Sequence, residues 1–180
     1  DKAIAVTVDS SANYCKAHPL TGGKQIVCES WRNLISVGAK PIAITNCLNF
    51  GNPENPKVMG EFAESLLGIK EACEFLDYPV VSGNVSLYNG TNKKNIYPTP
   101  VIGGIGLITN IKNRINHNLK KEDNIILQIG KSFGHLSQSI FFDEIYSIKD
   151  GPPPEINLSN EKNNGLAILK LINNKLALSV

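Results

Sequence analysis

The sequence predicts a domain of the mixed α/β or α+β class, in which helices pack against a layer of strands. Segments of strand and helix character follow one another in the order strand, helix, strand, helix, strand, strand. This order lacks the regular alternation of a doubly wound sheet. Neither glycine-rich phosphate motif, G-x-G-x-x-G or G-x-x-x-x-G-K-[ST], occurs in the chain.

The expected strands are apolar runs bounded by turn residues. They are expected at residues 3–8, 41–48, 78–88 and 99–108. In the third of them Val80, Val81 and Val85 are expected to anchor the segment in the core. Residues 89–95, which contain Gly90, are expected to form a hairpin loop.

Apolar residues at helical spacing predict the two helices. Over residues 24–37 they include Ile26, Trp31 and Leu34, and Gly38 follows as a helix-ending residue. The second helix is expected over residues 57–76, where one face carries apolar side chains: Val58, Phe62, Leu66, Ile69, Cys73 and Leu76. The polar segment 9–23, with its proline and glycines, is expected to be a loop.

A polar connector near residues 117–122 suggests a boundary between two parts of the chain. We therefore predict a first domain over residues 1–116 and the beginning of a second over residues 117–180. The second part is expected to contain a strand at 123–130, helical segment 136–148, an extended proline-rich link and a last helix capped by Ser159. Strand-like and helix-like runs reach both chain ends, so we interpret the chain as a piece of a longer polypeptide.

The composition is that of an ordinary globular protein, with 42% hydrophobic residues, 19% charged residues and a net charge of +2. This charge favours neither nucleic acid nor a membrane surface as a partner, and no apolar run approaches the roughly 18 residues of a membrane span. The cysteines are Cys15, Cys28, Cys47 and Cys73, without a zinc-type spacing, and we expect free buried thiols in a reducing cytoplasm. No nucleophile and base stand together, so chemistry here would rest on positioning and charge stabilisation.

Clusters of small polar residues follow or interrupt the apolar strands. They lie at residues 9–13, 45–52 and 82–86. Loops at strand ends present backbone amides and short side chains to ligands, and glycine allows a close backbone approach. Asn and Ser also supply oxygen atoms of the kind that Mg²⁺ prefers. The residues alone leave two alternatives open, since the same residue types also cap turns.

Three motifs, "NFGNPE", "SGNVSLYN" and "YPTP", occur in this order in the chain. Together, and at this spacing, they resemble the phosphoribosylformylglycinamidine synthases of the aminoimidazole ribonucleotide synthetase superfamily. The resemblance covers nearly the whole chain. It implies a mixed sheet with helices on one face, which is the N-terminal-type domain of the superfamily, followed by the start of the C-terminal-type α/β domain. This piece resembles the second of two tandem halves of the family enzyme.

The resemblance also implies roles for individual residues. Gly83 matches a residue that contacts ATP through its backbone, Asn84 a magnesium ligand, and Ser86 a contact to formylglycinamide ribonucleotide (FGAR). Asn46 occupies an ATP-contacting position that is usually aspartate in the family, so a negative charge is absent here. Asp9 is a further candidate, because superfamily members often keep an acidic residue at the end of the first strand. No catalytic residue is expected in this piece, since the family's catalytic histidine belongs to the first half.

The implied reaction is the ATP-dependent conversion of FGAR and ammonia to the amidine in purine biosynthesis. The resemblance implies ATP and Mg²⁺ as cofactors and a glutaminase domain or subunit as the source of ammonia, and it allows a small bridging subunit. The alternative is that this half holds nucleotide and serves assembly without turnover, because N-terminal-type domains of the superfamily pair through their sheets. The isolated piece is expected to be inactive, and a homodimer could take the place of the other half.

Overall fold

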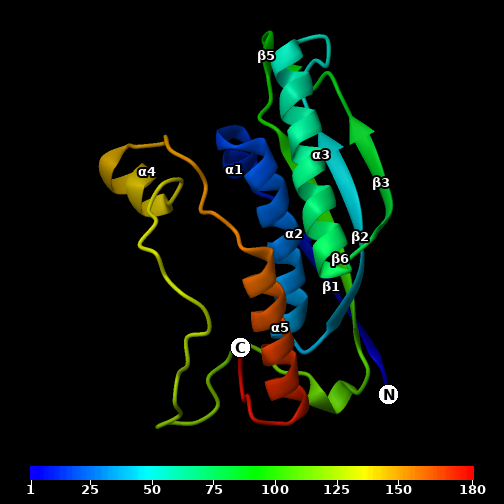
Figure 1. Ribbon diagram of the computed structural model, residues 1–180, viewed down its shortest axis with the longest axis vertical. Helices are drawn as coiled ribbons and strands as arrows, with labels where there is room; N and C mark the ends of the chain where they lie inside the picture. Colours follow the sequence, from blue (N-terminus) through cyan, green and yellow to red (C-terminus); the bar gives the residue numbers. More distant parts are fainter.

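The computed structural model describes residues 1–180 as a four-stranded sheet with helices packed on one side of it (Figure 1). The elements are β1 (Ala3–Asp9), α1 (Ala12–Ala17), α2 (Pro19–Ser36), β2 (Lys40–Asn49), α3 (Pro56–Leu76), β3 (Val80–Ser86), β4 (Gly90–Thr91), β5 (Lys94–Asn95), β6 (Thr99–Ile108), the 3-10 turn η1 (Ile111–Asn113), α4 (Ile140–Tyr146) and α5 (Leu158–Asn173). No helix is long and apolar enough to cross a membrane.

The sheet is mixed, in the order β1-β6-β2-β3. β6 runs antiparallel to both β1 and β2, whereas β2 and β3 are parallel. The connection from β2 to β3 passes through α3, as parallel pairs require. The predicted fold class, a mixed sheet with helices on one face, is therefore confirmed.

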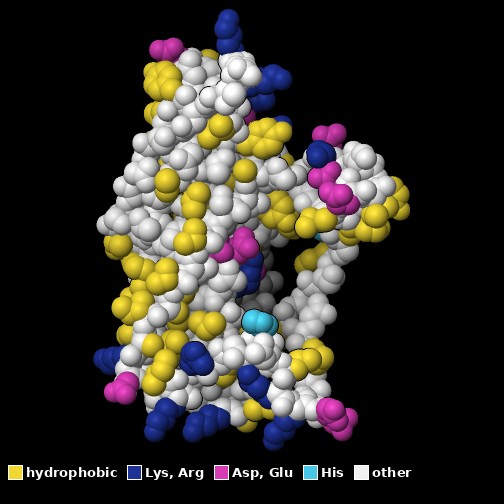
Figure 2. Space-filling model, turned by 180° about the vertical axis from the view of Figure 1, so that it is seen from behind, with side chains coloured by type: hydrophobic (Ala, Val, Ile, Leu, Met, Phe, Trp, Pro, Cys, Tyr) yellow, Lys and Arg dark blue, Asp and Glu magenta, His cyan; other side chains and the backbone are white.

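The core lies between the sheet and α2. Buried side chains from α2, such as Ile26, Trp31 and Leu34, meet Ile44 of β2 and Ile102 of β6. The opposite face of the sheet has no cover, and β1 leaves Ile4, Val6 and Val8 68–70% exposed there. Seen from behind, hydrophobic side chains are spread along the molecule (Figure 2).

The start of α2 corrects the expectation of a loop over residues 9–23. Pro19 occupies the first turn of α2, and Nδ1 of His18 caps the helix by accepting a hydrogen bond from the Thr21 amide at 3.2 Å. The two glycines that suggested a loop lie inside the helix and are buried. A Cβ on Gly22 would collide with Cys15 of α1, and one on Gly23 with Ser65 of α3, so they permit close helix packing.

The position of β3 corrects a second expectation. Val80, Val81 and Val85 are 44%, 66% and 53% exposed, so they do not anchor the segment in the core. β3 is an edge strand, and its outer edge carries no neighbour. The helix α2 packs on β1, β6 and β2, whereas α3 packs mainly beside α2. Because neither helix covers β3 fully, its valines remain accessible.

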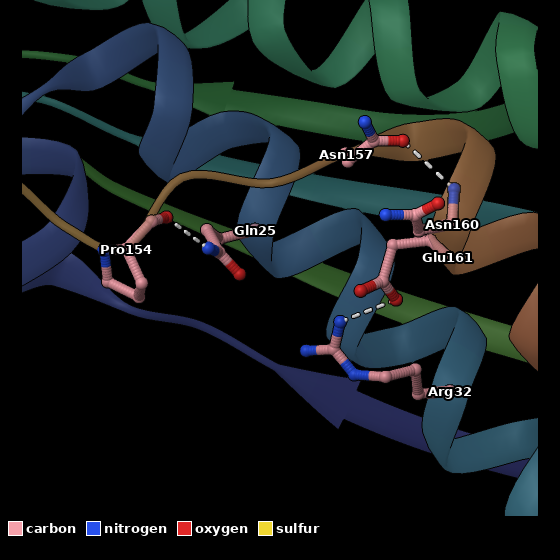
Figure 3. A network of polar contacts seen from close by, with 6 residues as sticks. All are labelled: Gln25, Arg32, Pro154, Asn157, Asn160 and Glu161. Atoms are coloured by element: carbon pink, nitrogen blue, oxygen red, sulfur yellow. Dashed lines mark hydrogen bonds and ion pairs between the residues drawn. The ribbon is translucent and has the colours of Figure 1, made fainter. Parts of the chain in front are cut away.

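The C-terminal helix α5 packs on α2, and polar contacts join α2 to this helix and to the segment before it (Figure 3). The Gln25 amide donates to the Pro154 carbonyl, and Arg32 pairs with Glu161 at 2.7 Å. Asn157, not Ser159, caps the helix by accepting from the Asn160 amide at 2.9 Å. The domain boundary near residues 117–122 stays a prediction.

Residues 123–130 contain no strand, contrary to expectation. A strand needs a hydrogen-bonded neighbour, and no other segment pairs with this one. Ile125 and Ile126 are 85% and 82% exposed as a result. The helix expected over residues 136–148 is present but shorter, because Ser139 caps it and Ser147 ends it in a left-handed conformation.

Candidate functional site

The carboxyl ends of β2 and β3 bring together most of the predicted site residues. In the parallel register Asn46 lies beside Gly83, and Cys47 lies beside Asn84. Ser86, the last residue of β3, lies beside Asn49, the last residue of β2. Ligands of layered α/β folds bind beyond such strand ends, so the location suits a binding site.

The two faces of the sheet divide these residues. Ile44 and Leu48 are buried on the helix-facing side, and strand alternation places Asn46 on the same side. The Ser82 hydroxyl donates to the Thr45 hydroxyl at 2.9 Å on the open face. Alternation then places Asn84 and Ser86 on the open face with Ser82. The side chain of Asn46 is therefore separated from those of Asn84 and Ser86 by the sheet itself.

Gly83 lies in the edge strand β3, beside Asn46 of β2. A Cβ at this position would collide with both the side chain and the backbone carbonyl of Asn46, so only glycine fits without a shift. The Ser86 carbonyl accepts from the Phe50 amide at 3.0 Å, which turns the backbone groups of Ser86 toward β2. Alternation along the regular stretch of β3 turns the N–H and C=O of Gly83 toward the unpaired edge, where a ligand can reach them.

A cleft of about 400 Å³ borders the helix-facing side of β3. Asn46 lines it together with Ile69 and Cys73 of α3 and with the segment that leads into β3. Its wall is mostly apolar, and charged residues of α3 such as Lys70 lie among the lining residues. The amide of Asn46 is thus a hydrogen-bonding group in a largely apolar cleft.

Ser86 is held by Asn89, a residue expected from the sequence only as part of a hairpin loop. The Asn89 amide nitrogen donates to the Ser86 carbonyl at 2.9 Å and to the Ser86 hydroxyl at 3.0 Å. The same nitrogen donates to the Phe50 carbonyl at 3.1 Å. The available signal was an asparagine shortly after a strand end, a residue type that bonds to nearby backbone.

Asp9 lies apart from this group, at the other edge of the sheet. It accepts hydrogen bonds from the Thr7 hydroxyl at 2.8 Å and from the Asn33 amide at 2.7 Å. β6 and β2 separate β1 from β3. Burial raises the pKa of nearby Glu29, and the charge of Asp9 raises it further. In this arrangement Asp9 ties α2 to the end of β1 and does not adjoin Asn84 or Ser86.

Tyr97 marks the start of β6 near the same end of the sheet. Thr99, the first residue of β6, lies beside Asn49. The ammonium group of Lys16 lies 3.8 Å from the centre of the Tyr97 ring, and this nearby positive charge lowers the pKa of the phenol. The pair lines a hollow of about 710 Å³ between α1 and α4.

The donor set determines what metal chemistry the chain can support. No group of three or more His, Cys, Asp or Glu side chains lies together in the structure. Asn84 offers one neutral amide oxygen on the open face, which suits a hard cation as a single ligand. The further ligands of an Mg²⁺ ion would have to come from a bound nucleotide and from other parts of a larger protein.

The model of the AIR synthase related protein family, N-terminal domain, matches residues 1–108. The chain belongs to this family. Its AIR synthase related part includes the whole four-stranded sheet, from β1 to β6, and therefore Asn46, Gly83, Asn84 and Ser86.

Two curated relatives of this AIR synthase related chain carry the same name. "Phosphoribosylformylglycinamidine synthase subunit PurL" of Pelagibacter ubique (strain HTCC1062) is 66% identical over 175 residues, which cover 97% of this chain and 24% of that protein. The protein of the same name from Bradyrhizobium diazoefficiens is 50% identical over 171 residues, or 95% and 23% of the two chains. The chain thus spans about a quarter of the length of the curated relatives it matches.

Solved structures agree with the family assignment. T. maritima PurL complexed with FGAR aligns with a TM-score of 0.69 and 29% identity, over 97% of this chain and 24% of that one. T. maritima PurL complexed with ATP gives a TM-score of 0.68 and 28% identity, over 97% and 25% of the two chains. The AIR synthase fold expected from the sequence is therefore confirmed.

Proposed function

We propose that this chain forms part of the nucleotide and substrate site of a phosphoribosylformylglycinamidine synthase. The full-length protein would convert FGAR, ammonia and ATP to the amidine, ADP and phosphate. The observation that carries the proposal is the 66% identity to a PurL subunit over 97% of the chain. The clustering of Gly83, Asn84 and Ser86 at one end of the edge strand supports it.

Within this proposal each residue has a binding role. The backbone of Gly83 contacts ATP from the free edge of β3, and Asn46 contacts it from the helix-facing side. Asn84 gives one oxygen ligand to Mg²⁺, and Ser86 binds FGAR on the open face. An edge strand suits binding roles on both faces of the sheet, because ligands at the free edge can reach either face. The neutral Asn46 binds through hydrogen bonds alone.

The chemistry requires positioning more than covalent participation. The γ-phosphoryl group of ATP is transferred to the oxygen of the glycinamide carbonyl of FGAR, which makes that oxygen a leaving group and leaves the formyl group intact. Ammonia then adds to the glycinamide carbonyl carbon, and phosphate departs as the C–N bond of the amidine forms. Mg²⁺ supplies charge neutralisation for the phosphates when bound. The residues of this chain hold and orient the reactants, as is typical of phosphoryl transfer.

Ammonia would come from a glutaminase domain or subunit. The word "subunit" in the names of the relatives supports a separate partner, and a small bridging subunit is compatible with it. We place the catalytic histidine in another part of the full-length protein.

The full-length protein, supplied with FGAR, ATP, Mg²⁺ and ammonium, tests the proposed function. Release of ADP and phosphate should depend on FGAR, and the amidine should appear in equal amount by mass spectrometry. Omitting ammonium should abolish amidine formation. ATP hydrolysis that is independent of FGAR, or no amidine with all reactants present, would contradict the proposal.

A second role, in assembly, is favoured by the open face of the sheet. Ile4, Val6 and Val8 are 68–70% exposed on it, next to the apolar strand β6. We propose that this face pairs with a second sheet and that the isolated chain uses a second copy of itself. Sedimentation should show a dimer that Val6→Lys converts to monomer, while Lys94→Glu in the hairpin leaves it intact. A monomer at high concentration would contradict this role.

A further inference from the structure

We infer that Asn89 is a positioning residue that fixes the hydroxyl group of Ser86 for substrate binding. This inference rests on the proposed function, because it assumes that Ser86 contacts FGAR. Asn89 itself follows β3 in the turn toward β4. Its side chain is half-buried and directed back at the strand that it has just left, as its hydrogen bonds show.

Asn89 is held in place by Phe50, the residue that follows β2. The Phe50 side chain is 1% exposed and packs edge-on against Phe62 of α3, with ring centres 5.0 Å apart. The Phe50 carbonyl accepts from the backbone amide of Asn89 at 3.1 Å and from its side-chain amide at 3.1 Å. Two N–H donors of Asn89 thus bond to the backbone carbonyl of Phe50, a residue whose side chain is held in the core.

The backbone between Ser86 and Asn89 bends sharply, so that the Asn89 side chain faces β3 again. Tyr88 has a φ of 60°, in the left-handed region that non-glycine residues seldom adopt. Its amide donates to the Gly51 carbonyl at 2.9 Å, which holds the turn against the loop after β2. This conformation has a cost for a tyrosine, and the hydrogen bonds of Asn89 offset it.

The hydrogen bonds determine what the Ser86 hydroxyl offers to a ligand. The Asn89 nitrogen donates to the hydroxyl oxygen at 3.0 Å, so that oxygen is fixed in place. The Ser86 hydroxyl oxygen lies 3.3 Å from its acceptor, Asn89 Oδ1, which is long compared with the usual 2.7–2.8 Å for hydroxyl donors. The hydrogen is therefore weakly held and can be given to a better acceptor, such as an oxygen atom of the substrate.

Asn89 thus acts on the substrate through Ser86 and not by contact. Without its amide, the Ser86 hydroxyl would rotate among its staggered positions and would lose its preset donor direction. The expected loss is that of one ordinary neutral hydrogen bond, or about five- to tenfold in affinity. The loss should affect the affinity for FGAR and not that for ATP, because neither Gly83 nor Asn46 is hydrogen-bonded to Asn89.

The test uses full-length protein, steady-state kinetics and calorimetric binding of FGAR. We expect Asn89→Ala to raise KM and Kd for FGAR about five- to tenfold, with kcat and the KM for ATP changed about twofold or less. Asn89→Asp should behave likewise, because it keeps Oδ1 but faces the Phe50 and Ser86 carbonyls with an oxygen. In Ser86→Ala protein, adding Asn89→Ala should cause no further loss.

Asn95→Ala is the matched control. Asn95 lies in the same hairpin and accepts from the Asn52 amide at 3.0 Å, but it does not touch Ser86. It should leave the KM for FGAR unchanged. If Asn89→Ala fails to fold, Asn89→Ser gives the same comparison with a short polar side chain that cannot span Phe50 and Ser86.

The outcomes separate this inference from the proposed function. A raised KM in Ser86→Ala with an unchanged KM in Asn89→Ala overturns the inference alone. Equal effects of Asn89→Ala and Asn95→Ala overturn it too, since they indicate a general effect of the hairpin. An unchanged KM for FGAR in Ser86→Ala overturns the role of Ser86 and the inference with it. Additive losses in the Ser86→Ala, Asn89→Ala double variant overturn the claim that Asn89 acts through Ser86.

Discussion

Gly83 is the residue on which the geometry of the edge strand depends most closely. It lies beside Asn46 in the parallel register, and the space that a Cβ would need is taken by the Asn46 side chain and carbonyl. Part of this obstacle is backbone, which cannot move aside as a flexible side chain could. The strand pair β2–β3 therefore admits no larger residue at this point without opening.

We predict that Gly83→Ala destabilises the chain by about 1–3 kcal/mol, the usual cost of overpacking. Gly60→Ala is the control, because Gly60 lies in α3 with nothing within 4 Å of the added carbon. That substitution should stabilise by about 0.5–1 kcal/mol, since alanine favours the helix. Urea unfolding of both variants measures the difference. Equal stability of the two would show that the strands accommodate a side chain at residue 83.

The chemistry of single residues was the least predictable from sequence. The motif "SGNVSLYN" pointed to Gly83, Asn84 and Ser86 through a family resemblance, but strand alternation alone could not place Asn46 on the opposite face. That required the register of β2 and β3, which depends on tertiary packing. The role of Asn89 also escaped prediction, because a side chain that returns to its own strand leaves no periodic signal.

At the scale of elements, α5 depends on one close approach to α2. A Cβ on Gly165 would collide with the ring of Trp31, so the helix approaches where its side chain is absent. Trp31 is 4% exposed and is the single tryptophan of the chain. The Arg32–Glu161 pair is partly exposed and adds little, since exposed ion pairs contribute about 0–1 kcal/mol. The glycine–tryptophan contact is thus the main determinant of how α5 packs.

We predict that Gly165→Val displaces α5 from α2 and exposes the indole of Trp31. Tryptophan fluorescence should shift to longer wavelength, and the amides of α5 should exchange hydrogen faster while those of β2 and β6 keep their protection. Leu166→Ala, at a 51% exposed position of the same helix, is the control and should change neither signal. An unshifted spectrum in Gly165→Val would indicate that the ring moves aside without loss of packing.

Long periodic elements were predictable, and their junctions were not. α3 matches expectation within one residue, because its apolar stripe is complete and Asp77 ends it in a left-handed conformation. The start of α2 was missed, since Gly22 and Gly23 resemble loop residues until the neighbouring helices are known. Residues 123–130 have strand composition but no neighbour to pair with, and pairing is not a property of one segment.

At the scale of the whole molecule, buried thiols link stability to pH. Burial raises the pKa of Cys15, Cys28 and Cys73 from 9.0 to about 12, and that of Tyr78 from 10.0 to about 12. These folded-state values lie above the unfolded ones. The unfolded chain therefore loses protons first as the pH rises, so the contribution to stability is complete below pH 9 and is lost progressively up to about pH 12.

We predict that the free energy of unfolding, measured with urea under reducing conditions, is level up to about pH 8.5 and falls above it. Each group can contribute a slope of up to about 1.4 kcal/mol per pH unit. Cys28→Ala should lower the free energy of unfolding at neutral pH but make its fall at alkaline pH shallower. Lys93→Ala, in the exposed hairpin, is the control and should leave the alkaline fall unchanged. A slope that is the same in Cys28→Ala and the parent would contradict the assignment.

The proposed function requires that the open face of β3 serves the synthetase reaction of the full-length protein, and substitution of Asn84 tests this requirement directly. In full-length protein, turnover should be measured while Mg²⁺ is titrated at saturating ATP and FGAR. We predict that Asn84→Ala requires about tenfold more Mg²⁺ for half-maximal turnover, as expected for the loss of one ligand. Ser82→Ala, which removes a neighbouring hydroxyl on the same face, should keep the original requirement. Unchanged kinetics of Asn84→Ala across the whole titration would contradict the proposed role of this face in the reaction.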